Sequence, residues 1–219
     1  MGDKKLYKEL VFFWFIVVLA THLMVRFSSW PFLRDYSGIF SALLMIYLPH
    51  FSRRSKEALL SLDLNWNKFY LSFKDVLLVS FIIFPLSFIV NHFYQTFLGR
   101  YYVSGLFLHS FLNHGLYQIL VVALPEEYFF RSYLQENLNS CWTKKWMIKG
   151  ISFGPALFIT SLVFALSHSL IYFQWWHGFI FFPSLVFGLL YEKRKTITAS
   201  VIFHALCNLF SAWVFQHYR

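Results

Sequence analysis

Ionisable side chains inside apolar stretches are the residues of this sequence best placed to do chemistry. A charged or strongly polar group within a hydrophobic span is costly unless it is paired or lines a wet cavity, so such groups are usually functional. One apolar stretch holds two adjacent glutamates and an arginine, a second holds a histidine, and a third holds a histidine and an asparagine. The residues concerned are Glu126, Glu127, Arg131, His168, His204 and Asn208.

The two adjacent glutamates have different surroundings on a helix. Glu127 and Arg131 are four residues apart, with the acid N-terminal to the base, so they can pair on one helix face. An architectural buried ion pair is the competing interpretation of these two residues. Glu126 lies about 100° further round the helix and is free to face another helix. Desolvation and the neighbouring carboxylate disfavour its charged form, which makes Glu126 a credible proton acceptor near neutral pH.

Two further stretches place functional side chains one helical turn apart. Phe164 and His168 are four residues apart, as are His204 and Asn208. A carboxylate and an imidazole can share a water and deprotonate it, while a second imidazole and an amide can donate hydrogen bonds to an oxyanion. The set therefore predicts a hydrolase.

Histidine and carboxylate side chains also bind zinc. The pairing expected on one helix of many zinc hydrolases, His-Glu-x-x-His, is absent from this sequence. We therefore expect no metal site and no cofactor, with zinc as the minority alternative. The two cysteines, Cys141 and Cys207, are interpreted as small apolar residues.

Membrane-spanning helices are expected to position these residues. Of the 219 residues, 58% are hydrophobic and only 13% are charged, whereas an ordinary soluble domain carries about 25% charged residues. The surface must therefore face hydrocarbon, where helices satisfy their own backbone hydrogen bonds. The predicted fold class is all-α, a polytopic transmembrane helix bundle that forms a single membrane domain over residues 1–219.

Apolar runs of about 20 residues predict about seven spans, with eight possible. The N-terminal run is kept as the first span because no small-residue cleavage site follows it. The spans are expected near residues 9–25, 36–51, 75–98, 113–135, 153–173, 177–192 and 197–216.

Basic residues alternate between the two ends of these spans, which predicts the orientation. Fourteen lie in loops assigned to the cytoplasmic side, and only four lie on the opposite side. The N-terminus is therefore expected in the cytoplasm and the C-terminus outside. The net charge of +9 reflects topology rather than nucleic-acid binding. The fourteen are Lys4, Lys5, Lys8, Arg53, Arg54, Lys56, Lys68, Lys74, Lys144, Lys145, Lys149, Lys193, Arg194 and Lys195.

Taken in order on separate spans, these motifs resemble those of the CPBP family, the CAAX proteases and bacteriocin-processing enzymes also called ABI, which includes the type II CAAX prenyl endopeptidases. The stretch Glu126-Glu127-x-x-x-Arg131 is similar to the first family motif. The second and third motifs are matched by Phe164-x-x-x-His168 and His204-x-x-x-Asn208. The resemblance covers residues 115–215, so residues 1–112 are expected to form variable N-terminal spans and residues 113–216 a catalytic core.

The resemblance implies a glutamate-dependent intramembrane endopeptidase that hydrolyses a peptide bond at or near the membrane. Glu126 and His168 would then activate the water, and His204 and Asn208 would form the oxyanion hole. Support for the site would come from Glu127, Arg131 and Phe164.

The expected partners are a membrane-associated peptide or protein substrate and the lipid bilayer, with no nucleic acid and an open oligomeric state. The expected location is a bacterial cell membrane, crossed several times. Prenylated proteins, bacteriocin-like peptides and C-terminal sorting tails are all compatible substrates.

Two functions from other classes are alternatives. Intramembrane glutamates and histidines also form proton relays, so a proton-coupled transporter is an alternative, although the sequence has no inverted repeat. A non-catalytic membrane scaffold of the same fold is the other.

The expected span limits leave one difficulty. At about 1.5 Å per residue, His204 would lie nearer the cytoplasmic end than His168. We therefore expect the fifth span to run on toward Trp176. Beyond it, His177 is expected in an interfacial aromatic belt.

Overall fold

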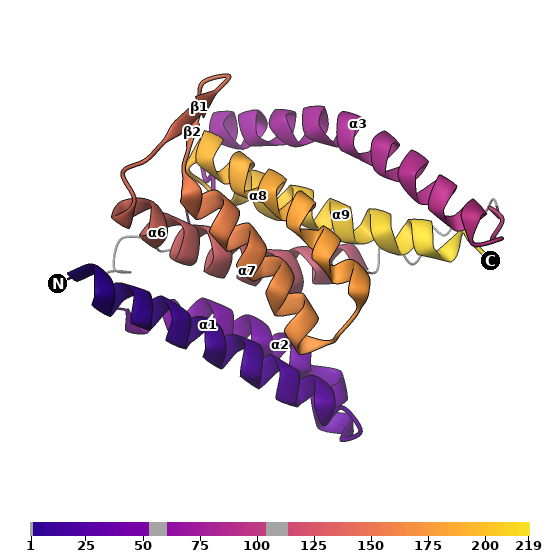
Figure 1. The fold of residues 1–219 in the computed structure, drawn as a ribbon, viewed down its shortest axis with the longest axis horizontal. Coiled ribbons are helices and arrows are strands. Elements are labelled where there is room, and N and C mark those ends of the chain that lie inside the picture. The colour runs from indigo at the N-terminus through magenta and orange to yellow at the C-terminus, as the bar shows by residue number, and fades with distance from the viewer. Residues whose placement is uncertain (1, 53–60, 104–113) are drawn as a thin grey trace.

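Apolar helices make up most of this computed structural model, which describes residues 2–52, 61–103 and 114–219. The predicted all-α bundle is confirmed (Figure 1). The first three long helices are α1 (Gly2–Arg26), α2 (Pro31–Tyr47) and α3 (Trp66–Phe97), with a 3₁₀ turn at Leu48–Phe51 after α2. The remaining long helices are α7 (Pro155–Ile171), α8 (Phe181–Arg194) and α9 (Thr198–Gln216), and a 3₁₀ segment, Trp175–Ile180, precedes α8.

The central helix, residues 114–141, forms the core of the bundle. It changes its winding along its length, from the π-helical stretch Gln118–Ala123 through α5 (Leu124–Glu127) and a second π-helical stretch, Tyr128–Gln135, to α6 (Glu136–Cys141). Every residue of Tyr128–Gln135 is buried. A helix that is buried on all sides belongs to a protein interior. Here α2, α7, α8 and α9 pack around it, and Phe13 of α1 stacks on its Tyr133.

A short β-hairpin, which the sequence analysis did not predict, joins the central helix to α7. Strands β1 (Trp146–Ile148) and β2 (Ile151–Phe153) pair antiparallel. Lys149 and Gly150 have positive φ, at 50° and 79°, as a tight two-residue hairpin turn requires. This hairpin carries the exposed Met147 and Ile148 at the end of the bundle where α8 ends.

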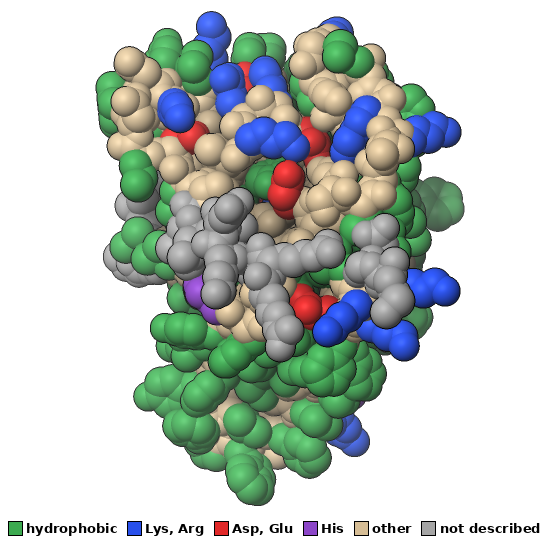
Figure 2. Space-filling view, turned by 90° about the vertical axis from the view of Figure 1, so that its left-hand side faces the viewer, with side chains coloured by type: hydrophobic (Ala, Val, Ile, Leu, Met, Phe, Trp, Pro, Cys, Tyr) green, Lys and Arg blue, Asp and Glu red, His purple; other side chains and the backbone are tan. Residues whose placement is uncertain are grey.

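Successive long helices run in opposite directions, so the described basic clusters meet at one end of the bundle. The N-terminus, the hairpin and the end of α8 all lie on the left of Figure 1. Figure 2 views this end and shows Lys and Arg side chains above a lower part covered by hydrophobic side chains. We call it the basic end. Arg53, Arg54 and Lys56, which the sequence analysis assigned to the same side, lie outside the described residues.

Helix α3 begins earlier than the expected residue 75. The side chain of Asn65 accepts a hydrogen bond from the amide of Asn67, which caps the helix before Trp66. Asp75 is buried beside this polar end and pairs with Lys193 at 2.7 Å and with Arg194. These ion pairs tie α3 to the end of α8.

The fifth span does not run on toward Trp176, so that expectation was wrong. Helix α7 ends at Ile171. Instead, α9 begins deeper in the molecule than α7 does, and residues 61–63 contact its start. The amide of Ile197 donates to the Ser61 carbonyl at 2.9 Å, and the amide of Asp63 donates to the Thr198 hydroxyl at 2.7 Å. This stagger brings His204 level with His168.

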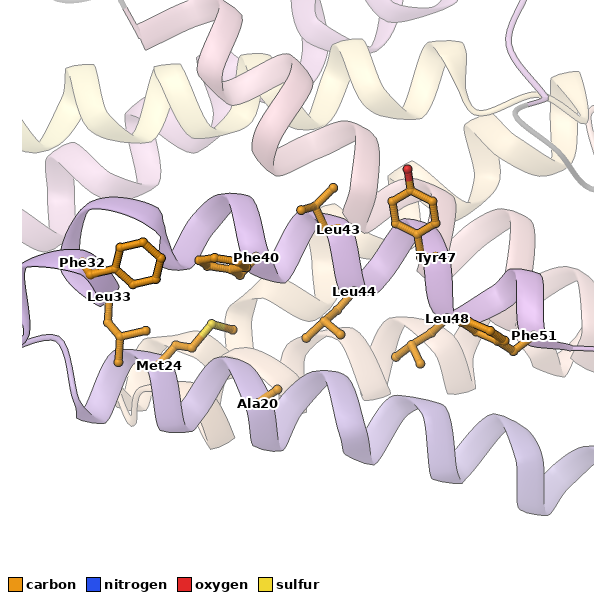
Figure 3. A pocket seen from close by; sticks show the side chains of 10 residues that line it. All are labelled: Ala20, Met24, Phe32, Leu33, Phe40, Leu43, Leu44, Tyr47, Leu48 and Phe51. Carbon is orange, nitrogen blue, oxygen red and sulfur yellow. The ribbon is translucent and has the colours of Figure 1, made fainter.

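Three helices of the described chain are long and apolar enough to cross a membrane: Lys4–Arg26, Trp66–Phe97 and Thr198–Gln216. Helix α7 is apolar but shorter, at 17 residues. An open groove of about 500 Å³ between α1 and α2 is lined by apolar side chains and the ring of Tyr47 (Figure 3), so hydrocarbon can fill it at little cost in polar dehydration. The groove therefore suits contact with lipid rather than chemistry.

We expect reporter fusions in intact cells to place the two chain ends on opposite sides of the membrane. The charge asymmetry predicts that a C-terminal reporter active only outside the cytoplasm is active, and that the same reporter at the N-terminus is inactive. A matched fusion after Gly150, in the hairpin turn, should also be inactive. An active N-terminal fusion would contradict the orientation.

Candidate active site

The winding of the central helix determines how the two glutamates are presented. Pro125 has no amide hydrogen to donate, and the preceding Leu124 donates to Ile119, five residues back. The α-helical turn that holds Glu126 and Glu127 is thus flanked by wider π-helical turns. Such turns often occur at functional sites. The only sequence signal for this winding was Pro125.

Glu127 is fully buried and is held from two sides. Its Oε2 accepts a hydrogen bond from Arg131 Nε at 3.0 Å, so the predicted ion pair is confirmed. Its Oε1 lies 2.9 Å from His204 Nδ1. A carboxylate only accepts, so His204 Nδ1 carries the hydrogen and Nε2 points away from Glu127.

Arg131 is also fully buried, and each of its three nitrogens has a partner. Besides Glu127, its Nη2 donates to Ser184 Oγ at 2.7 Å and its Nη1 to Gln135 Oε1 at 3.3 Å. The guanidinium carbon lies 5.5 Å from the centre of the Phe164 ring. These contacts compensate the desolvation of the charge.

Glu126 faces both imidazoles. Its Oε2 lies 3.7 Å from His204 Nε2 and 4.0 Å from His168 Nε2, just beyond hydrogen-bonding distance. This oxygen is buried and has no hydrogen-bond partner among the described residues. The carboxylate that the sequence left without a basic partner is therefore the one that meets the two histidines.

Aromatic rings and a backbone carbonyl fix the orientation of the imidazoles. His168 Nδ1 donates to the Phe164 carbonyl at 2.9 Å, which leaves Nε2 toward Glu126. The Phe164 ring centre is 4.8 Å from that of His168 and 5.7 Å from that of His204. Phe187 stacks on His204 at 4.7 Å. Both imidazoles thus present Nε2 to the same carboxylate oxygen.

Two residues at the edge of the site have partners that the sequence analysis did not identify. The side-chain amide of Asn208 donates to Gln118 Oε1 at 2.9 Å, which ties α9 to the central helix. His177, expected only in an aromatic belt, lies with its ring centre 6.0 Å from that of His168. Neither contact follows from spacing along one helix.

A cavity of about 100 Å³ opens beside Glu126 and His168. Helices α1 and α2 form its far wall, with side chains such as Val17, Ala42 and Met45. The hydroxyls in the wall are paired with other groups. Thr21 donates to Ser41 at 3.1 Å, and Trp14 Nε1 donates to Ser167 at 2.8 Å. The cavity is therefore mostly apolar apart from Glu126 and His168.

A zinc site would need several His, Cys, Asp or Glu side chains to converge on one point. Among the described residues, no group of three or more His, Cys, Asp or Glu side chains is arranged to hold a metal ion. The expectation that the protein needs no cofactor stays a prediction.

Comparison with known proteins gives one family match. Residues 108–210 match the family model described as Type II CAAX prenyl endopeptidase Rce1-like. The matched range includes every site residue named from the sequence, and α1, α2 and α3 lie outside it. No curated protein and no solved structure matched the chain.

We expect Arg131→Met to destabilise the folded protein by about 3–5 kcal/mol, because it leaves the buried Glu127 carboxylate without its cation. Adding Glu127→Gln should recover part of this loss by removing the unpaired charge. The free energies of unfolding are compared in mixed micelles. As a control, Arg34→Met breaks an exposed pair with Asp35 and should change little. Equal effects of the two arginine substitutions would contradict the assignment.

Proposed function

Because residues 108–210 match the model of the Rce1-like family of type II CAAX prenyl endopeptidases, we propose that this chain is a glutamate-dependent intramembrane endopeptidase. In this proposal Glu126 and His168 activate the water that attacks the substrate carbonyl. The observation that carries it is the approach of Glu126 Oε2 to two imidazole nitrogens, at 3.7 and 4.0 Å. Polar atoms separated by more than about 3.5 Å can be bridged by a water molecule.

The first step of the proposed reaction is proton transfer from water to Glu126. The water oxygen forms a bond to the peptide carbonyl carbon while Glu126 accepts its proton, and His168 Nε2 accepts the second water hydrogen as a hydrogen bond. The carbonyl π electrons move to oxygen and form an oxyanion. Glu126 suits this role because its Oε2 has no hydrogen-bond partner among the described residues.

His204 and Asn208 are proposed to stabilise the oxyanion. The Glu127 carboxylate at 2.9 Å holds the imidazole of His204 through Nδ1, and a hydrogen on Nε2 would be donated to the oxyanion. Asn208 uses one amide hydrogen on Gln118 and retains the second for the oxyanion. Collapse of the intermediate breaks the C–N bond, and the proton on Glu126 passes to the leaving amine.

The cavity beside Glu126 is proposed to receive substrate residues next to the scissile bond. Its apolar lining suits a membrane-associated peptide, which we propose as the substrate class. The family match and the three apolar helices support an integral membrane protein, and we place it in a bacterial cell membrane. No metal takes part in the proposed steps.

We expect Glu126→Gln to lower kcat by about 10²–10⁴-fold, because the amide cannot accept the proton. Its thermal stability should stay close to that of the wild type, since Glu126 Oε2 has no hydrogen-bond partner in the described chain to lose. The assay follows cleavage of membrane peptides by mass spectrometry with purified protein. Asp35→Asn, at an exposed position of α2, is the matched control. Normal cleavage by Glu126→Gln would contradict the proposal. Loss of wild-type activity after treatment with a metal chelator would favour the zinc alternative.

Filling the cavity should impair substrate use without changing the reacting groups. Ala42→Phe places a ring in the cavity, so we expect kcat/KM for peptide cleavage to fall by about tenfold or more. Leu43→Phe, on the neighbouring α2 residue that lines the lipid-facing groove, should leave kcat/KM within about twofold. Equal effects of the two substitutions would argue against substrate binding in this cavity.

A further inference from the structure

A second set of buried polar side chains continues from the candidate active site toward the basic end. On the central helix, Glu127 and Arg131 are followed at intervals of four residues by Gln135 and Asn139. Residues three or four apart share a helix face. Facing this row on α8 is a second row with the same spacing, formed by Ser184, Gly188 and Glu192. The two rows form a ladder of polar contacts between the helices.

Gln135 occupies the middle of the ladder and is fully buried. Its Oε1 accepts from Arg131 Nη1 at 3.3 Å and lies 3.2 Å from the Thr160 hydroxyl. Its Nε2 donates to the Gly188 carbonyl at 3.3 Å and to Glu192 Oε1 at 2.8 Å. A cation on one side and acceptors on the other permit only one orientation of the amide.

Gly188 makes room for this contact. A Cβ atom there would lie 2.8 Å from Gln135 Oε1 and 2.3 Å from Leu157 Cδ1. Any side chain at position 188 would therefore push Gln135 away from α8. The absence of a side chain lets the amide bind the α8 backbone directly.

Glu192 ends the ladder with a buried carboxylate. Its Oε1 also accepts from Asn139 Nδ2 at 2.6 Å, and its Oε2 accepts from Lys195 Nζ at 2.8 Å. Lys195 lies in the turn before α9, with a φ of 55°. Burial alone lowers the pKa of Lys195, but the hydrogen bond to Glu192 and the charge of Glu136 outweigh it and raise that pKa. Lys195 therefore remains a cation at neutral pH.

We propose that Gln135 and Glu192 are positioning residues for the reaction. They hold Arg131 in the conformation that fixes Glu127 and, through Glu127, the orientation of His204. This inference rests on the proposed function. Buried ionic groups contribute little to stability compared with apolar residues of the same shape, whereas a misplacement of about 1 Å at a catalytic group can cost about 10²-fold in rate.

The ladder can be tested by exchanging the side chains of Gln135 and Glu192, which contact each other. Gln135→Glu places a second carboxylate against Glu192, so kcat should fall by about 10²-fold while KM stays within about twofold. Combining it with Glu192→Gln restores a donor opposite the carboxylate at position 135, which Arg131 then binds, while the Gly188 carbonyl still lacks its donor. The double variant should recover at least about tenfold of the lost kcat. Gln216→Glu, on an exposed residue of α9, is the control.

The pH profile of kcat separates positioning from a general loss of structure. A displaced Glu127 changes the support of His204, so Gln135→Glu should shift the profile, and the double variant should shift it back. Glu192→Gln alone introduces no like charge and serves as the second variant if Gln135→Glu does not fold. It should lower kcat less than Gln135→Glu and leave KM unchanged.

Unchanged kcat and pH profile in the folded variants would overturn the positioning role, as would a double variant that shows only the sum of the single effects. If the wild-type protein cleaves no peptide while remaining folded, the proposed function fails instead. Cleavage by the wild type with no coupling between positions 135 and 192 leaves the function in place and removes only this inference.

Discussion

The buried carboxylate of Glu127, held between a guanidinium and an imidazole, is the constraint on which the rest of the site depends. The positive charge of Arg131 compensates the desolvation of the fully buried carboxylate. His204 Nδ1 donates a hydrogen bond to its other oxygen at 2.9 Å. Three helices must meet at this point, because Ser184 of α8 completes the partners of Arg131. A buried charge that lacks one of these partners is unfavourable, so the contact specifies how the central helix, α8 and α9 pack.

The same contact separates the roles of the two adjacent glutamates. With Glu127 occupied, the neighbouring Glu126 turns toward the Nε2 atoms of His168 and His204. The stagger between α7 and α9 is what makes this possible, because His168 lies near the end of its helix and His204 near the start of its own. The family match covers this core, whereas α1 and α2, which lie outside it, close the cavity beside Glu126.

The sequence predicted those features that depend on one helix or on burial alone. The pair of Glu127 and Arg131 follows from a spacing of four, and the helical bundle follows from the apolar runs. The contacts of Gln135 and Gln118 were missed because they join helices distant in sequence, and an amide in an apolar stretch does not indicate its partner. The fifth span was extended wrongly because the depth at which α9 begins depends on residues 61–63, a tertiary contact. The π-helical stretches on either side of Pro125 could likewise not be predicted from a single proline.

In the proposed mechanism, Glu126 delivers water directly to the substrate carbonyl, so no covalent peptidyl-enzyme forms. The measurement that tests it is mass spectrometry of protein and product, quenched during a single turnover with excess enzyme in water labelled with heavy oxygen. We expect labelled carboxyl product to appear as fast as substrate is lost, while the mass of the protein stays unchanged. A peptidyl adduct on the protein that forms before the product would contradict it.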